Sequence, residues 1–203
     1  MRLYIIRHGE TQWNKQHLLQ GMADIALNEK GRELARITGE KLAEIPFYKA
    51  YSSPLVRAMD TAKLVLGGRD IPIVPDDRIT EMSFGEWEGK YYGPDSADIP
   101  SDRLDCFFHH TEAYIPPKGG ESFAQVIART HDLYEELISN PEYEDKNILI
   151  SSHGASSRAF LQSVIQDGNV WQTGVPQNCA VTIVEVKNKQ VIQVELDHLY
   201  YEE

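Results

Sequence analysis

Near the start of the chain, the stretch Leu3-Tyr4-Ile5-Ile6-Arg7-His8-Gly9-Glu10 joins a short apolar run to a polar exit. An apolar run of this length predicts a buried strand. Open α/β sheets bind their ligands just beyond the carboxyl ends of such strands, which is where these polar residues stand. An imidazole can attack phosphorus while a neighbouring guanidinium holds the phosphoryl oxygens. The stretch therefore indicates a phosphoryl site that the rest of the chain has to complete.

Strand and helix patterns alternate along the remaining sequence. Strands are predicted for residues 50–53, 71–74 and 148–150, followed by a β-hairpin of 180–186 and 190–196. Helices are predicted for residues 28–45, for 54–66 with Pro54 in the first turn, for 121–140 and around 160–165. This alternation is typical of the α/β class, and specifically of a three-layer α/β/α sandwich with a mostly parallel central sheet.

Residues 91–118 interrupt the alternation, because their periodicity is weak and they are rich in proline, aromatic residues and histidine. We interpret them as a short irregular lid insertion and not as a separate domain. The chain has no internal repeats and no low-complexity tracts. A single domain over residues 1–203 is therefore expected, and this length suffices to bury a substantial core.

The charge balance restricts the partners that the protein can bind. Its formal net charge is -11, which argues against a nucleic-acid binder because backbone affinity depends on clustered Lys and Arg. A small phosphorylated metabolite would feel no global attraction, so its site must supply a local positive pocket. The sequence is compatible with a homo-oligomer but does not specify one.

The cysteines and the apolar segments indicate the redox state and the cellular compartment of the protein. The two cysteines, Cys106 and Cys179, are far apart and lack metal-ligand spacing, so both are expected to be free thiols. The first apolar run ends at Arg7, which is too early for a signal peptide, and no apolar segment approaches the length of a membrane span. We expect a cytoplasmic protein with no membrane partner.

Two of the predicted strands end in the same pair of residues, His8-Gly9 and His153-Gly154. If these strands lie side by side and run parallel, both imidazoles reach the same edge of the sheet. These pairs belong to a longer series of motifs, which is Arg7-His8-Gly9-Glu10-Thr11 with Asn14, Gln20-Gly21, Ser52-Ser53-Pro54 with Arg57-Ala58 and Thr61-Ala62, Arg78-Ile79-Thr80-Glu81-Met82, Phe84-Gly85-Glu86-Trp87-Glu88-Gly89, Gly119-Gly120-Glu121-Ser122 and Ser152-His153-Gly154.

In content and order, this series resembles the histidine phosphatase superfamily, which includes the phosphoglycerate mutase-like enzymes. The resemblance covers roughly residues 3–165. Each motif is weak to moderate by itself, whereas the ordered series is highly specific. One departure is Ala155, at a position where a second glycine often follows Ser-His-Gly. The extra methyl group is expected to alter packing in the pocket without removing its chemistry.

The resemblance implies a metal-independent phosphomonoesterase that needs no cofactor and forms a phosphohistidine on His8. It implies that Glu81 donates a proton to the leaving alcohol and later deprotonates water. Arg7, Arg57 and His153 complete the expected catalytic group. The residues expected to bind the phosphate or the substrate are Arg7, Asn14, Gln20, Gly21, Arg57, His153 and Gly154.

The residue types fit this chemistry. A phosphoryl group in transfer spreads negative charge over three oxygens and needs fixed positive donors, which Arg7, Arg57 and His153 could supply without a metal. Helix N-termini after Pro54 and at Gly154 are expected to aim N–H groups at the same anion. His8 must be neutral to attack, and nearby arginines should lower its pKa. Its second ring nitrogen must donate a hydrogen bond, so that the attacking nitrogen keeps its lone pair.

Two other functions remain open at this point. A cofactor-dependent phosphoglycerate mutase must shield its phosphohistidine from water, and residues 91–118 look short for that task. A non-catalytic module that binds a phosphorylated ligand would be expected to have lost a catalytic group, and none is missing here. The substrate is not specified. Candidate specificity residues in and beside the insertion are Lys90, Tyr91, Tyr92, Arg103, His109, His110 and Lys118.

Overall fold

The computed structural model describes residues 1–93, 96–165, 170–171 and 174–202. Its centre is a six-stranded sheet with the strand order β3-β2-β4-β1-β5-β6. The strands are β1 (Arg2–Arg7), β2 (Phe47–Ser52), β3 (Ile73–Pro75), β4 (Asn147–Ser152), β5 (Val181–Lys187) and β6 (Gln190–His198). The strands β1 to β4 run parallel to one another, whereas β5 is antiparallel to β1 and forms the predicted antiparallel hairpin with β6 at one side.

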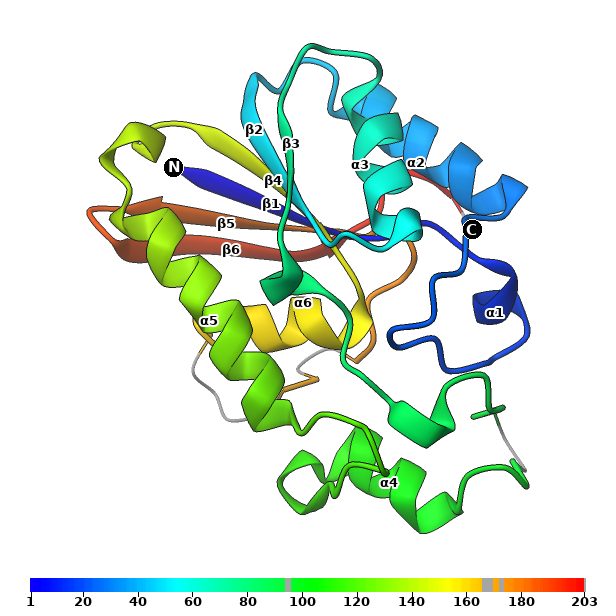
Figure 1. Ribbon diagram of the computed structural model, residues 1–203. Helices are drawn as coiled ribbons and strands as arrows, with labels where there is room; N and C mark the ends of the chain where they lie inside the picture. The colour runs from blue at the N-terminus through cyan, green and yellow to red at the C-terminus, as the bar shows by residue number, and fades with distance from the viewer. Residues whose placement is uncertain (94–95, 166–169, 172–173, 203) are drawn as a thin grey trace.

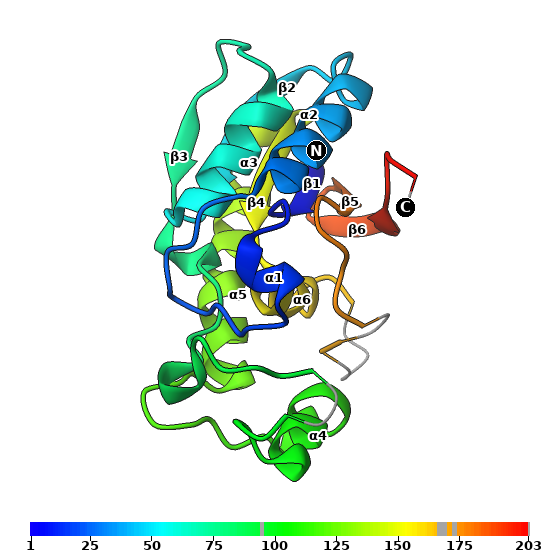
Figure 2. The same ribbon diagram turned by 90° about the vertical axis from the view of Figure 1, so that its right-hand side faces the viewer.

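Helices cover both faces of this sheet. Figures 1 and 2 show α2 and α3 on one face and α5 and α6 on the other, with α4 beyond the start of α5. The helices are α1 (Gln12–Lys15), α2 (Glu29–Lys41), α3 (Val56–Leu66), α4 (Ser101–His109), α5 (Phe123–Ser139) and α6 (Gly154–Leu161). The predicted three-layer α/β/α sandwich with a mostly parallel sheet is confirmed.

Alternation along the central strand decides which helix layer each side chain joins. Leu3 and Ile5 of β1 are buried in the cluster that includes Leu133 of α5. Tyr4 and Ile6 point the other way, into the cluster of α2 and α3. Successive side chains of a strand face opposite sides, so this one apolar run contributes to both halves of the core.

The ends of the helices follow local chemistry that the sequence displays. The side chain of Asn28 accepts a hydrogen bond from the backbone of Gly31 and begins α2. Gly67 ends α3 with φ of 59°, a left-handed conformation that glycine adopts readily. The predicted start of α3 was slightly wrong, because Pro54 precedes Leu55, the residue that caps the helix.

The insertion is more regular than predicted. It contains α4, with a short 3-10 turn, Thr111–Ala113, just after it. Phe107 of α4 is buried in a third apolar cluster, together with Phe123 and Val126 of α5. The insertion is therefore packed against the body of the protein. No helix within the described residues is both long and apolar enough to cross a bilayer.

Candidate active site

The first candidate residues meet because β1 and β4 are parallel neighbours, as the paired His-Gly motifs suggested. Arg7 lies opposite Ser152 in this pairing, so His8 and His153 leave the sheet together at its carboxyl edge. Their ring centroids are 5.1 Å apart. Residues separated by about three-quarters of the chain thus share one site.

His8 is buried, and its hydrogen bonding fixes its tautomer. Nδ1 lies 2.7 Å from the carbonyl oxygen of Gly9, which can only accept, so Nδ1 carries the proton and donates it. Nε2 therefore keeps its lone pair. Burial, followed by the charges of Arg57 and Arg7, holds the pKa of His8 well below its usual range. His8 is a neutral imidazole at neutral pH, with one nitrogen available for attack.

Close backbone packing explains the glycine that follows. A Cβ on Gly9 would stand 2.4 Å from the carbonyl oxygen of Gly31 in α2, closer than any real side chain allows. The backbone N–H of Gly9 donates to Oγ1 of Thr61, at 3.0 Å. The turn after β1 is thereby held between α2 and α3, and His8 with it.

Arg57 projects from the first turn of α3 and is fully buried. Its guanidinium donates to the carbonyl oxygens of Gly21 and Ala23, both at 2.7 Å. Its Nε donates to Nδ1 of His153, at 3.1 Å. Burial lowers the pKa of Arg57 to about 10, which leaves it charged at neutral pH. This cation is locked in place before any ligand arrives.

The state of His153 differs from the expectation. Because its Nδ1 accepts from Arg57, the ring proton must lie on Nε2, which donates to Oγ of Ser53 at 2.8 Å. Burial, with the charge of Arg57 next, holds the pKa of His153 well below its usual range. His153 is therefore a neutral group that bridges Arg57 and Ser53, and not a third cation. The contact with Ser53 was not foreseen.

Arg7 supplies a donor that the protein does not use. One terminal nitrogen donates to the carbonyl oxygen of Pro176. Its Nε is buried and has no hydrogen-bond partner within the described residues. Burial lowers the pKa of Arg7. A buried, unpartnered N–H on a guanidinium is costly unless an anion completes it, so this atom indicates where an anionic ligand binds.

The carboxylate of Glu81 is held by four backbone N–H groups. Its Oε2 accepts from the backbone N–H groups of Gly154 and Ala155, and its Oε1 from those of Ser156 and Met82. The first turn of α6 therefore binds this carboxylate, whereas the sequence had suggested that it faces a phosphoryl group. The start of α3 is similar, because the N–H of Val56 donates to Asp24 at 2.7 Å.

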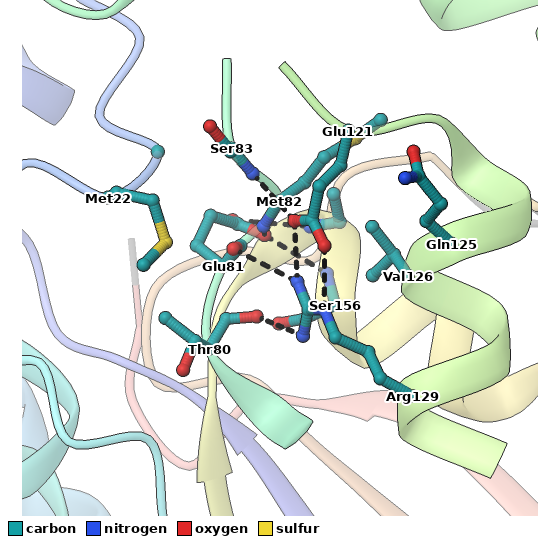
Figure 3. Close-up of polar contacts among 12 residues, drawn as sticks. Met22, Thr80, Glu81, Met82, Ser83, Glu121, Gln125, Val126, Arg129 and Ser156 are labelled. Atoms are coloured by element: carbon teal, nitrogen blue, oxygen red, sulfur yellow. Dashed lines mark hydrogen bonds and ion pairs between the residues drawn. The ribbon is translucent and has the colours of Figure 1, made fainter. Parts of the chain in front are cut away.

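Arg129 of α5 clamps the segment that carries Glu81 (Figure 3). It donates to the carbonyl oxygens of Arg78, Thr80 and Glu81 at 2.7–3.1 Å. It also pairs with the carboxylate of Glu121, which accepts from the N–H of Ser83. Arg129 and Glu121 thus grip the backbone on both sides of Glu81. Glu121, the first residue of the predicted helix 121–140, lies just before α5 and belongs to this clamp.

Replacing Arg129 by Met is expected to destabilise the protein by about 2–4 kcal/mol, because Glu121 and three carbonyl oxygens lose a charged donor. Denaturant unfolding measures this change. The matched control is Arg36→Met, which removes an exposed arginine whose ion pair with Glu33 is also exposed. Equal unfolding free energies for the two variants would show that the clamp contributes nothing.

The candidate residues surround a cavity of about 610 Å³. Within the described part of the chain, eight of the nine predicted site residues line it, and His153 stands behind them. The eight are Arg7, His8, Asn14, Gln20, Gly21, Arg57, Glu81 and Gly154. The amide oxygen of Asn14 accepts from the backbone N–H of Thr11, and the amide oxygen of Gln20 accepts from the Thr11 hydroxyl. In the described part of the chain their amide nitrogens have no partner and remain as donors for a ligand.

Several residues at the cavity were missed. Pro176 and Asn178 lie just before β5 and contact Arg7 and the carbonyl oxygen of His8, respectively. No motif marks this loop, and its position between a helix and a sheet strand is the only signal that could have drawn attention to it. Of the specificity candidates proposed for residues 90–118, Tyr92 alone lines the cavity among the described residues.

Metal ligands are not gathered in the described residues, where no three His, Cys, Asp or Glu side chains come together in a suitable cluster. His110 instead lies near Asp105 and Glu112 on the exposed surface of the insertion. The two cysteines are unpaired, as expected. Among the described lining residues, the positive charge at the cavity comes from Arg7, Arg57 and Lys30.

Comparison with known proteins extends the resemblance. A model of the histidine phosphatase superfamily (branch 1) matches residues 3–197. The 2,3-bisphosphoglycerate-dependent phosphoglycerate mutase 2 of Gloeobacter violaceus is 34% identical over 167 residues, which cover 80% of this chain and 74% of that protein. The glucosyl-3-phosphoglycerate phosphatase of Mycobacterium tuberculosis is 34% identical over 172 residues, covering 81% and 75% of the two chains.

The fold is also similar to that of a solved structure. The solved structure of YhfR from Bacillus stearothermophilus is 32% identical and superposes with a TM-score of 0.87 over 97% of this chain and 96% of its own. Both the family model and the superposition span nearly the whole chain. The protein therefore belongs to the histidine phosphatase superfamily, a family of phosphatases and mutases whose characteristic mechanism passes through a phosphohistidine.

Proposed function

We propose that this protein is a phosphomonoesterase in which His8 is the nucleophile and Glu81 the proton donor. The observation that carries the proposal is the state of His8. It is a buried, neutral imidazole beside the cations Arg7 and Arg57, with Nδ1 fixed by Gly9 and with no hydrogen-bond partner for Nε2 within the described residues. Such a group is a nucleophile in place, with anion-binding donors around its target.

In the first step, Nε2 of His8 attacks phosphorus and the bond from phosphorus to the alcohol oxygen breaks. Glu81, in the fraction of the enzyme in which its carboxyl group carries a proton, gives that proton to the departing oxygen. Arg7 and Arg57 stabilise the charge on the three phosphoryl oxygens, and Nδ1–H donates to Gly9 as positive charge develops on the ring. The products are an alcohol and phosphohistidine.

In the second step, Glu81, now a carboxylate, takes a proton from water. The water oxygen attacks phosphorus, and the bond to Nε2 breaks. Inorganic phosphate leaves, with His8 neutral and Glu81 protonated again. Two arginines supply the positive charge that both steps need. We therefore propose that the enzyme is metal-independent. We also propose that its substrates are small phosphorylated metabolites.

His153 acts in this scheme by orientation. Its Nδ1 accepts from Nε of Arg57 and so fixes the orientation of the guanidinium group. Its ring also lies against that of His8. Asn14 and Gln20 are proposed to bind phosphoryl or substrate oxygens through their amide nitrogens. Gly154 contributes its backbone N–H, which donates to Oε2 of Glu81 at 2.9 Å.

The proposal is tested by a panel of phosphorylated metabolites in which released phosphate is measured, with and without EDTA. We expect phosphate release in both conditions. Activity that EDTA removes and Mg²⁺ restores would contradict metal independence. Isomerisation of 3-phosphoglycerate, measured in parallel, distinguishes the mutase, and the absence of any turnover together with binding of phosphorylated compounds would favour a non-catalytic module.

A further inference from the structure

We propose that the cavity beside His8 binds an uncharged, largely apolar leaving alcohol, such as an aryl or arylalkyl group. This inference rests on the proposed phosphatase function and names the substrate class of the same site. It comes from five aromatic side chains that line the cavity together with the phosphoryl-binding residues. We call them the aromatic wall, which consists of Phe84, Tyr92, Phe107, Phe108 and Trp171.

The aromatic wall is one continuous surface. Phe107 contacts the rings of Phe84, Phe108 and Trp171, with centroids 5.4, 4.9 and 5.1 Å away. Tyr92 extends the row, 6.2 Å from Phe108. Aromatic pairs at these separations attract one another beyond their mere burial. Side chains from four separate segments therefore form a single apolar face.

This face is formed before a ligand binds. Phe107 is buried, and its ring is stacked on Phe123 of α5, with centroids 5.3 Å apart. The indole nitrogen of Trp171 donates to the carbonyl oxygen of Phe107, at 2.6 Å. The polar atom of Trp171 is thereby engaged with the backbone. Little side-chain ordering remains to be done on binding, which favours affinity for a rigid apolar group.

Two members of the wall still expose apolar surface. Phe108 and Tyr92 are only partly buried, whereas Phe84, Phe107 and Trp171 are buried. A leaving group that covers Phe108 and Tyr92 removes their surface, and its own, from water. The cavity volume of about 610 Å³ lies in the range that holds small organic molecules, well beyond the needs of a phosphate alone.

The charges around the cavity exclude an acidic leaving group. Among the described lining residues, the cations are Arg7, Arg57 and Lys30. The phosphoryl group engages the two arginines. Lys30 is mostly exposed and lies 3.7 Å from the carboxylate of Glu10, which offsets its charge. Glu202 adds a further negative charge at the lining. A carboxylate on the leaving alcohol would find no unmatched cation here and would be repelled.

The test compares kcat/KM for three alkyl phosphates with similarly poor leaving groups. These are 2-phenylethyl phosphate, glycerol 1-phosphate and 3-phosphoglycerate, which are apolar, polar and acidic, respectively. We expect 2-phenylethyl phosphate to exceed glycerol 1-phosphate by about 10–100-fold, because a buried phenyl group contributes that much. The value for 3-phosphoglycerate should be the lowest.

Phe108→Ala locates the effect. It should lower the ratio of the phenylethyl to the glycerol value about 10-fold, and Phe108→Leu should restore part of it. The ratio does not depend on how much enzyme is folded, so partial misfolding cannot produce this result. The matched control is Ile115→Ala, which removes an exposed apolar side chain from the same insertion, outside the cavity. Its ratio should equal that of the unmodified protein.

The two proposals fail differently. If glycerol 1-phosphate or 3-phosphoglycerate is hydrolysed as well as 2-phenylethyl phosphate, or if Phe108→Ala leaves the ratio unchanged, the apolar subsite is overturned and the phosphatase stands. If none of the three substrates and no aryl phosphate releases phosphate, the proposed function itself is overturned. A clear preference for 2-phenylethyl phosphate that depends on Phe108 supports both proposals.

Discussion

Replacing His8 by alanine is expected to reduce phosphate release from every substrate by a factor of about 10⁴ or more, because the covalent route disappears with the attacking nitrogen. Arg7, Arg57 and Glu81 stay in place, so substrate binding should largely survive. Released phosphate and near-ultraviolet circular dichroism, measured on the same purified variant, separate loss of chemistry from loss of fold.

The matched control for this variant is His131→Ala. His131 is an exposed histidine of α5 whose ring contacts Ser163, far from the cavity lining. This variant should keep the full activity. Turnover by a folded His8→Ala protein at more than a few per cent of the normal rate would show that another group attacks phosphorus.

Replacing Glu81 by glutamine is expected to act differently on good and poor leaving groups. An alkoxide needs a proton as it departs, so alcohol release from 2-phenylethyl phosphate should slow by about 10²–10⁴-fold. A nitrophenolate leaves without protonation, so the burst of nitrophenol from 4-nitrophenyl phosphate should change less than about tenfold. The phosphoenzyme should then accumulate, because water also loses its base.

Rapid-mixing measurements of the first turnover give both rates. Glutamine would turn an N–H group toward the N–H donors of α6, so some loss of stability is expected, but the ratio of the two rates is independent of the folded fraction. The control is Glu86→Gln, which changes an exposed carboxylate in the short 3-10 helix Gly85–Trp87. Equal slowing of both substrates by Glu81→Gln would remove Glu81 as the proton donor.

Much of the fold could be predicted because its signals are local. The apolar run before Arg7, the side chain of Asn28 at a helix start and the left-handed Gly67 each act within a few residues. The helix α4 was missed because it lacks such local signals. Its N-cap residue is Pro100, which provides no side-chain hydrogen bond, and Phe107 is the one residue of its nine that is buried. Its helical form depends on packing against the rest of the protein, which no local pattern displays.

The candidate site also combines features that local sequence predicts with features that depend on tertiary contacts. The meeting of His8 and His153 follows from parallel strands that end in the same motif, so it could be predicted. The neutral state of His153 depends on Arg57, 96 residues earlier in the chain. The use of the α6 N-terminus depends on Glu81, 73 residues before Gly154. Such contacts are set by tertiary structure, as is the aromatic wall, and no spacing in the sequence reveals them.

Direct detection of the phosphorylated enzyme tests the central claim, that His8 carries the phosphoryl group. The enzyme is mixed with a ³²P-labelled substrate and quenched within one turnover, in base. The account predicts a label that is stable in base, lost in acid as a phosphoramidate is, and located on the peptide that contains His8. A label that survives acid, or one that lies on any other residue, would contradict the account.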